Sequence, residues 1–294
     1  MRTGLTGRGS TGSAGTGSPS TGAGGPDQPP RPTMKTHAAV TGGGSALHRY
    51  RTVIVGRPGL GALVRFELCM LARNVPGALG LVLRRLLWPP LFAGCGRGVM
   101  FASGITLRHP GRIRLGDRVV VAENCILDGR HDTAAIAIDI GPGCILADNV
   151  MLQCKGARIR IGADVGIGPG SLLQTTSGAD IRIGDDALIG PRCTVIGAGN
   201  YNTDRLDVPI RLQGLKSQPG VEIGADVWMG CNVTVLTGSL IGRGAILAAG
   251  AVVRGEVAAH AVMGGVPARP IGTRIPGGAG PAGQRRPVPA RADA

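Results

Sequence analysis

Few side chains in this chain are suited to proton transfer near neutral pH, because it contains only five histidines among 294 residues. His131 stands in the segment Asp128-Gly129-Arg130-His131-Asp132, where either carboxylate could orient the imidazole. A histidine held in this way is a natural general base. His131 is therefore one candidate for a catalytic residue, and an exposed loop histidine without a chemical role is the alternative.

A second polar group follows a glycine-rich stretch and comprises Tyr201, Asn202 and Asp204. An asparagine orients a hydroxyl group but cannot accept its proton, and a tyrosine hydroxyl ordinarily ionises only near pH 10. These residues are therefore better suited to lining an acceptor site than to removing a proton at pH 7. A folded but chemically silent loop is the alternative interpretation.

The seven cysteines argue against a disulfide framework and against a zinc site. Their number is odd and no two are spaced as C-x-x-C. A free cysteine packs as a small hydrophobic residue. We therefore expect reduced, buried thiols and no metal site.

The element that must position these residues is a repeat of six. From residue 113 onward an aliphatic residue recurs at every sixth position and is usually followed by Gly or Ala. These rung positions are Leu115-Val121-Leu127, Ile140-Leu146-Leu152, Ile161-Ile167-Leu173, Ile183-Ile189-Val195 and Ile223-Met229-Val235-Ile241-Leu247-Val253. A period of six fits neither a helix nor an isolated strand and predicts a β-solenoid. We expect roughly six triangular coils of parallel strands about 4.8 Å apart, with the glycines supplying turn conformations. A narrow interior also explains why only 2% of the residues are aromatic.

The hexad rhythm stops between Val195 and Ile223, which predicts an inserted loop at residues 196–222. An excursion from a regular scaffold is a common place for functional residues. On this register His131 leaves the first coil and Tyr201 leaves the fourth. Three coils separate them by about 14 Å along the axis, so we expect them not to share one site.

The flanks differ from the solenoid in composition. Residues 1–50 are rich in Gly, Ser, Thr and Pro and predict a disordered tail, with Met34 as an alternative start; no apolar signal-peptide core is visible. Residues 51–98 predict a basic helical segment, residues 99–275 the solenoid domain, and residues 276–294 a loose tail. The net charge of +14 lies mainly in the flanks, which disfavours a nucleic-acid reader.

Two amphipathic segments are predicted as helices, Leu60 to Arg73 and Ala78 to Trp88, with a break at Pro76-Gly77. Residues 51–100 carry seven arginines and one glutamate, a net charge of +6. Two interpretations of residues 58–92 stay open: the helices pack on the solenoid, or they lie in a membrane interface with arginines reaching lipid phosphates.

Several stretches resemble the hexapeptide-repeat acyltransferases, most closely the sugar and exopolysaccharide O-acetyltransferases of the colanic-acid and maltose or galactoside type. They are Leu107-Arg108-His109-Pro110, Val227-Trp228-Met229-Gly230, Ala248-Ala249-Gly250-Ala251-Val252-Val253 and Gly265-Val266-Pro267-Ala268-Arg269. The resemblance implies a left-handed parallel β-helix and homotrimers with active sites between neighbouring subunits. It also implies acetyl-CoA or another acyl-CoA as donor, a sugar or glycan hydroxyl as acceptor, polysaccharide biosynthesis, and a cytoplasmic location, at the inner face of the membrane if residues 58–92 bind lipid.

The resemblance also assigns site residues. Asp204-Arg205-x-Asp207-Val208-Pro209-Ile210 resembles the family's active-site loop, and the family's general-base histidine falls at Tyr201. This departure leaves a catalytically silent scaffold as the alternative function. The donor positions of the family fall on Trp228, Cys231, Ala249, Arg254, Arg269 and Arg274. Small corner residues and solvated arginines are the alternative for these positions. A γ-class carbonic anhydrase would need three zinc-binding histidines, and His109, His131 and His260 lack that spacing.

Overall fold

A computed structural model describes residues 45–131 and 133–276 of the chain. Contacts divide the chain into Met1–Pro32 and Thr33–Ala294, and every described element belongs to the second unit. The predicted tails lie outside the described residues except at residues 45–50 and 276, and Ala46–Tyr50 form a helix where the composition predicted disorder.

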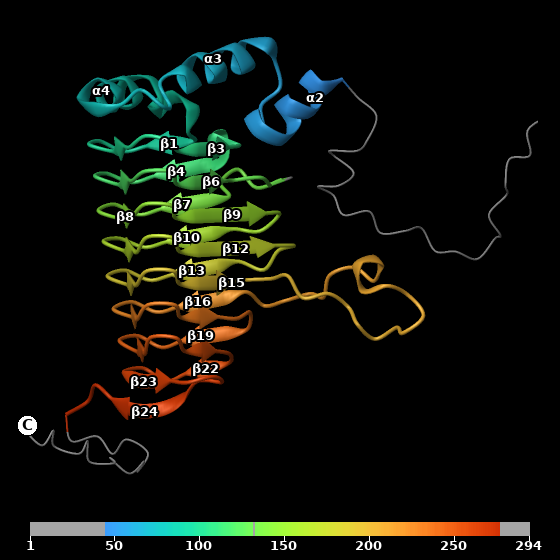
Figure 1. The fold of residues 1–294 in the computed structure, drawn as a ribbon, viewed down its shortest axis with the longest axis vertical. Helices are drawn as coiled ribbons and strands as arrows, with labels where there is room; N and C mark the ends of the chain where they lie inside the picture. The colour runs from blue at the N-terminus through green and yellow to red at the C-terminus, as the bar shows by residue number, and fades with distance from the viewer. Residues whose placement is uncertain (1–44, 132, 277–294) are drawn as a thin grey trace, which may run out of the picture. The chain divides into compact units, whose positions relative to one another are not determined.

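Helices precede the solenoid, as predicted (Figure 1). They are α2 (Ala46–Tyr50), a π-helical turn (Arg51–Val55), α3 (Leu60–Leu71) and α4 (Gly77–Leu87), and short 3-10 turns occur at Pro89–Leu91, Pro110–Arg112 and Ile210–Leu212. Pro76 caps α4, and Pro89 begins the turn that follows it. Proline lacks a backbone N–H and suits these positions at helix boundaries.

The strands form three sheets. Sheet A contains β1 (Gly94–Cys95), β4 (Ile113–Leu115), β7 (Ile138–Ile140), β10 (Ile159–Ile161), β13 (Ile181–Ile183), β16 (Val221–Ile223), β19 (Ser239–Ile241) and β22 (Glu256–Val257). Sheet B contains β2 (Met100–Phe101), β5 (Val120–Val121), β8 (Ile145–Leu146), β11 (Gly166–Ile167), β14 (Leu188–Ile189), β17 (Trp228–Met229), β20 (Ile246–Leu247), β23 (Ala261–Gly264) and β24 (Arg269–Thr273). Sheet C contains β3 (Thr106–Arg108), β6 (Ile126–Asp128), β9 (Met151–Lys155), β12 (Leu172–Thr176), β15 (Thr194–Ile196), β18 (Thr234–Val235) and β21 (Val252–Val253).

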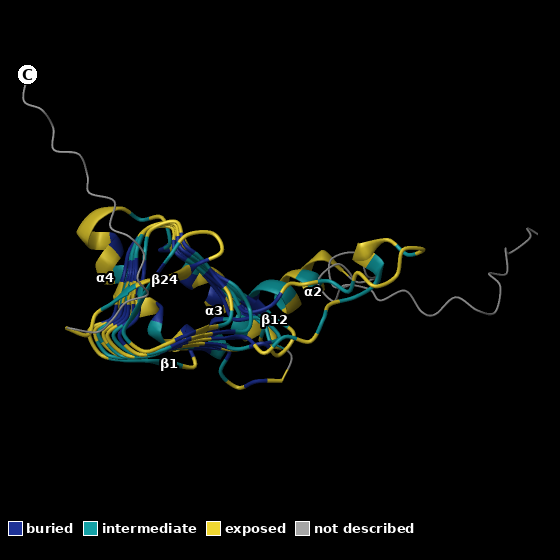
Figure 2. Ribbon diagram, turned by 90° about the horizontal axis from the view of Figure 1, so that it is seen from below, coloured by how far each residue is buried: buried dark blue, intermediate teal, exposed yellow. Residues whose placement is uncertain are grey.

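Each coil contributes one strand to each sheet, and strands of successive coils pair in parallel, so the fold is a parallel β-solenoid. Viewed along the stack, the coils superpose and their sheets form three sides (Figure 2). All predicted rung residues are buried. The described residues hold eight coils, the last incomplete, where the sequence predicted roughly six. The first coil has Cys95, Phe101 and Leu107 at its rung positions, and a search for aliphatic rungs alone misses it.

The glycines that follow the rungs have a different role from the predicted one. None of them has a positive φ. Instead they lie against the next coil: a Cβ on Gly116 would stand 2.5 Å from the backbone N of Pro142. The left-handed conformations occur two positions later, at residues such as Asn149 and Asp164. The expectation that these glycines supply turn conformations was therefore wrong, and close packing of the coils explains them.

The inner faces of α3 and α4 cover the first coil. Arg84 is 1% exposed, and its guanidinium donates to the carbonyl oxygens of Phe101 (2.9 Å), Ala72 (2.8 Å) and Val75 (2.9 Å). Burial lowers the pKa of Arg84. Trp88 is fully buried against the ring of Phe101 and donates from Nε1 to the carbonyl of Cys69. For these inner faces, the interpretation that the helices pack on the solenoid is thus confirmed.

The outer surfaces of sheets A and B differ in chemistry. The outward residues of sheet A are mostly charged: Gly94, Arg114, Asp139, Arg160, Arg182, Glu222, Leu240 and Glu256. The outward residues of sheet B are Met100, Val120, Ile145, Gly166, Leu188, Trp228, Ile246 and Val262. Sheet B therefore presents an uncharged, largely apolar stripe along the stack.

Candidate functional site

The predicted inserted loop is an arm between β15 and β16 (Figure 1). Its two sides are held together by backbone hydrogen bonds. Asn202 N donates to the carbonyl of Gly214 and Lys216 N to that of Asn200, both at 2.9 Å, and Tyr201 pairs with Leu215 in an antiparallel bridge. These bonds fix the position of Tyr201 at the base of the arm.

Gln213 holds the outer part of the arm. Its Nε2 donates to the carbonyl oxygens of Arg205 (2.6 Å) and Val208 (2.7 Å), and its Oε1 accepts from the N–H of Arg205. The side chain of Asn202 donates from Nδ2 to the carbonyl of Gln213. Asp204 is largely exposed and forms an ion pair with Lys216 at 3.5 Å. Asn202 and Asp204, which were expected to line an acceptor site, thus bond within the arm.

A cleft of about 810 Å³ lies where the arm meets two coil corners. It is lined by Gly199, Asn200, Tyr201, Thr203, Ile210, Lys216, Gln218, Pro219, Thr237, Gly238, Arg254 and Gly255. It brings together Tyr201 and Arg254, which are far apart in sequence. Thr237 was not among the predicted site residues. Its Oγ1 is buried and has no hydrogen-bond partner, whereas buried polar groups are normally paired.

The other predicted donor residues gather at the opposite edge of sheet C. Cys231 and Ala249 are exposed at the corners that precede β18 and β21, in successive coils. Gly230 lets these corners approach, because a Cβ on it would lie 2.7 Å from the N of Ala249. Trp228 is 54% exposed on sheet B beside them. The result is a shelf of small corner residues, with the Arg192 side chain bonded to Asn232 at its edge.

The two terminal arginines lie apart. Arg269 is exposed on β24, opposite Gly264 in the antiparallel pair that ends sheet B. The guanidinium of Arg274 instead donates to Asp226 Oδ2 (2.9 Å) and to the carbonyl of Gly244 (3.0 Å). The guanidinium of Arg274 thus fastens the C-terminal segment to two coil corners.

His131 lies three strands away from the arm in sheet C, as predicted: it follows β6, and the arm follows β15. Its Nδ1 accepts from the N–H groups of Thr133 (3.1 Å) and Ala134 (3.0 Å). The buried carboxylate of Asp128, a predicted orienting group, pairs with Arg130 at 2.6 Å and Arg108 at 3.4 Å. His131 therefore has a role in holding its own loop.

All seven cysteines are free. Burial raises the pKa of Cys95 and Cys125 to about 11 and that of Cys154 to about 12. Cys231 is the exposed one. Within residues 45–131 and 133–276, no group of His, Cys, Asp and Glu could hold a metal ion.

Comparison with known proteins finds similar sequences over parts of the chain. The model of the bacterial transferase hexapeptide (six repeats) matches residues 220–255, which form the coils beside the cleft. The chain is 30% identical over 168 residues to a protein of Mycobacterium tuberculosis named "Probable acetyltransferase", with 55% of each chain covered.

A second relative is the Escherichia coli protein named "Putative lipopolysaccharide biosynthesis O-acetyl transferase". It is 45% identical over 65 residues, which are 22% of this chain and 33% of the relative. The matched part of the chain thus spans about half of the first relative and a third of the second. Among solved structures, a galactoside acetyltransferase in complex with coenzyme A is 19% identical with a TM-score of 0.37, covering 71% and 79% of the two chains.

Proposed function

We propose that the protein is an acyl-CoA-dependent O-acyltransferase that acetylates a hydroxyl group of a sugar or glycan precursor. The observation that carries the proposal is the cleft at the base of the arm. It combines the Tyr201 hydroxyl, the charge of Arg254 and the unpaired Thr237 hydroxyl on hexapeptide coils. The transferase names of the two relatives support the reaction class. They do not favour the alternative of a silent scaffold.

The proposed reaction transfers the acyl group directly. The acceptor oxygen attacks the thioester carbonyl, the carbon–sulfur bond breaks, and the acceptor proton ends on the sulfur of coenzyme A. In this proposal the Tyr201 hydroxyl donates its own proton to the leaving sulfur as it accepts the proton of the acceptor, so it need not ionise and no separate base is required. Thr237 would hold a second acceptor hydroxyl, and Asn202 and Asp204 keep the arm in position.

The acyl-CoA donor would bind along both edges of sheet C. The shelf of Cys231 and Ala249 accommodates a thin, uncharged chain such as pantetheine, with Trp228 beside it. Arg254 and Arg269 are exposed and suited to phosphate groups. Because Arg274 is already bonded to Asp226, its contribution would be to hold the C-terminal segment. No metal is needed for this reaction.

We propose a homotrimer. The apolar stripe of sheet B supports this, since monomers rarely expose a continuous apolar surface of such length. The separation of the cleft from the donor shelf by sheet C also supports it, because a neighbouring copy would bring the two kinds of residue together.

We propose that the enzyme works at the inner, cytoplasmic face of a membrane, where acetyl-CoA is available, through contact by residues 58–92. No helix within the described ranges is long and apolar enough to cross a bilayer.

The test is acetyl transfer by the purified full chain. We expect free thiol to be released from acetyl-CoA when the correct sugar acceptor is present. Tyr201→Phe should lower kcat/KM by about a hundredfold, because the proton path is broken. Tyr201→His should keep substantial activity, since it restores the residue that the family has at this position.

One control variant and two contradicting outcomes define the result. His131→Ala should leave kcat/KM within about twofold of the original, since His131 lies three strands from the arm. If a broad panel of sugar acceptors releases no thiol and acetyl-CoA leaves Tm unchanged, the protein is not this transferase. An unaltered rate in Tyr201→Phe would remove Tyr201 from the mechanism.

A further inference from the structure

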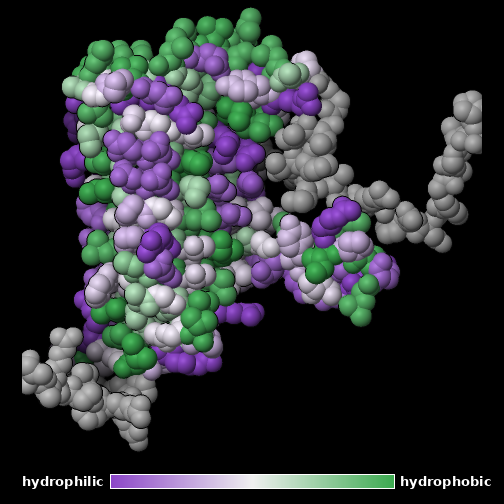
Figure 3. Space-filling view, in the orientation of Figure 1, coloured by the Kyte–Doolittle hydropathy of each residue, from purple (hydrophilic) through white to green (hydrophobic). Residues whose placement is uncertain are grey.

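The outward faces of α3 and α4 carry nine exposed, large apolar side chains. They are Leu60, Val64, Leu68 and Leu71 on α3, and Leu79, Leu81, Val82, Leu86 and Leu87 on α4. Figure 3 shows apolar residues gathered at the end of the stack where these helices lie. A soluble monomer rarely exposes a continuous apolar patch of this kind without a partner for it.

Rotation of the helices could not hide this surface. Phe66 and Cys69 of α3 are buried on the opposite side, and Arg84 of α4 is fixed by its carbonyl acceptors. The inner faces are thus committed to the first coil. The outer apolar faces are a second, independent feature of the same helices.

Positive charge borders the apolar surface. Arg57, Arg65 and Arg85 are exposed and form no ion pair with any described residue. The acid in this region is Glu67, whose carboxylate accepts a hydrogen bond from the Tyr50 hydroxyl at 2.6 Å. A second copy of the same surface would bring like charges together, whereas an anionic surface complements them.

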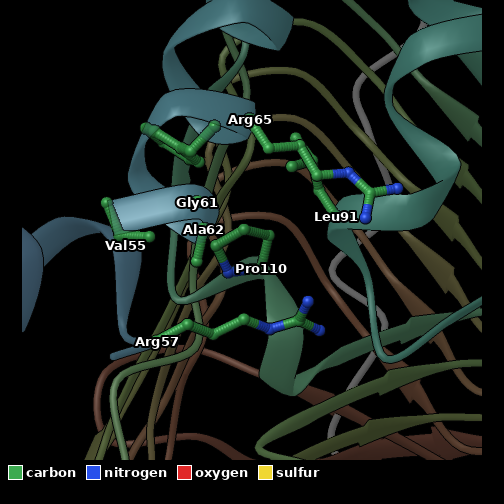
Figure 4. A pocket seen from close by; sticks show the side chains of 8 residues that line it. Val55, Arg57, Gly61, Ala62, Arg65, Leu91 and Pro110 are labelled. Atoms are coloured by element: carbon green, nitrogen blue, oxygen red, sulfur yellow. The ribbon is translucent and has the colours of Figure 1, made fainter. Parts of the chain in front are cut away.

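A small cavity of about 270 Å³ lies at the edge of this surface, lined by Arg57 and Arg65 with apolar Val55, Phe66 and Leu91. In Figure 4 the two guanidinium groups project toward the same side, with Pro110 between them. Two arginines placed around an apolar cavity suit a phosphate group that is attached to an apolar body.

We propose that the outer faces of α3 and α4 dock on a bilayer that contains anionic lipid. The apolar side chains enter the boundary of the acyl chains, and Arg57 and Arg65 receive a lipid phosphate at the rim. The helices have 12 and 11 residues, so they are about 18 and 16 Å long and lie in the interface plane rather than spanning the bilayer. This docking does not depend on the proposed transferase activity.

The experiment is flotation of the full chain with vesicles of phosphatidylcholine alone and with 30% phosphatidylserine. We expect flotation with the anionic vesicles, weakened by added salt. Leu68→Gln with Leu86→Gln should reduce the bound fraction more than tenfold, since both side chains are about two-thirds exposed on the proposed surface. Leu240→Gln, an exposed leucine on sheet A, is the matched control and should bind normally.

A second variant tests the charge. Replacement of Arg57, Arg65 and Arg85 by Gln should weaken binding to anionic vesicles by about a hundredfold, at roughly fivefold for each arginine. Absence of flotation by the original chain would overturn the proposal, as would equal flotation of the leucine variant. A change in oligomer size in the leucine variant without any vesicle binding would show that the surface joins copies of the chain. Transfer to a water-soluble acceptor should be unaffected in every variant, which separates this test from the catalytic one.

Discussion

Cys231 differs from the other cysteines in its exposure, and this difference gives a test of the donor shelf. We expect one thiol of the native protein to react rapidly with a thiol reagent at pH 8, and all seven to react after unfolding. The buried thiols of Cys125 and Cys154 should stay unreactive until the pH approaches about 11 and about 12, respectively, because their raised pKa values keep them protonated.

Coenzyme A should slow the modification of Cys231, since its pantetheine chain would cover that corner. Cys231→Ser should abolish the rapid phase and serves as the control. Equal modification rates with and without coenzyme A would place the donor elsewhere.

Residue types predicted which positions fill the interior of the coils, but they did not predict why glycines follow those positions. An aliphatic residue at each sixth position has one structural consequence, so the interior of the coils could be read directly from the sequence. Gly116 could not, because a glycine fits both a left-handed turn and a close approach. Only the backbone of the next coil, 2.5 Å from the place where a Cβ would stand, distinguishes the two.

At the level of elements, Arg84 joins α4 to the link after α3 and to the first coil. Arg84→Met is expected to destabilise the protein by about 3 kcal/mol, because several buried carbonyl groups lose their donor at once. Chemical unfolding measures this change. Arg85→Met, at an exposed neighbour, is the control and should change the unfolding free energy by less than about 0.5 kcal/mol. Equal effects of the two substitutions would contradict this role for Arg84.

The helix periodicity predicted α3 and α4 closely, yet it could not place Arg84. An arginine in an amphipathic pattern is expected to face solvent, and its burial depends on carbonyl groups brought near by tertiary packing. For a similar reason, the sequence predicted only one of the two sides of the cleft. The break in the hexads located the arm and Tyr201, whereas Thr237 sits at an ordinary coil corner, and only the returning arm makes that corner part of a cleft.

At the level of the whole molecule, sheet B gives the test of assembly. We expect the full chain to sediment as a trimer. Ile145→Gln with Leu188→Gln should shift it toward monomer by removing two large apolar groups from the stripe, and Leu240→Gln on sheet A should not. A trimer that is unaltered by the double substitution would mean that copies associate through another face.

Sheet C also determines how far the cleft lies from the first coil along the stack. Five strand spacings of about 4.8 Å separate β3 from β18, so the cleft stands roughly 24 Å from the first coil. If α3 and α4 dock on a membrane, the number of coils sets the distance between the cleft and the lipid surface. The acceptor hydroxyl would then have to be carried to that height, which selects sugars far along a lipid-linked chain over those next to its anchor. Removal of one complete coil would shorten the distance between the cleft and the lipid surface by one strand spacing. The acetylated position would then be expected to move toward the lipid.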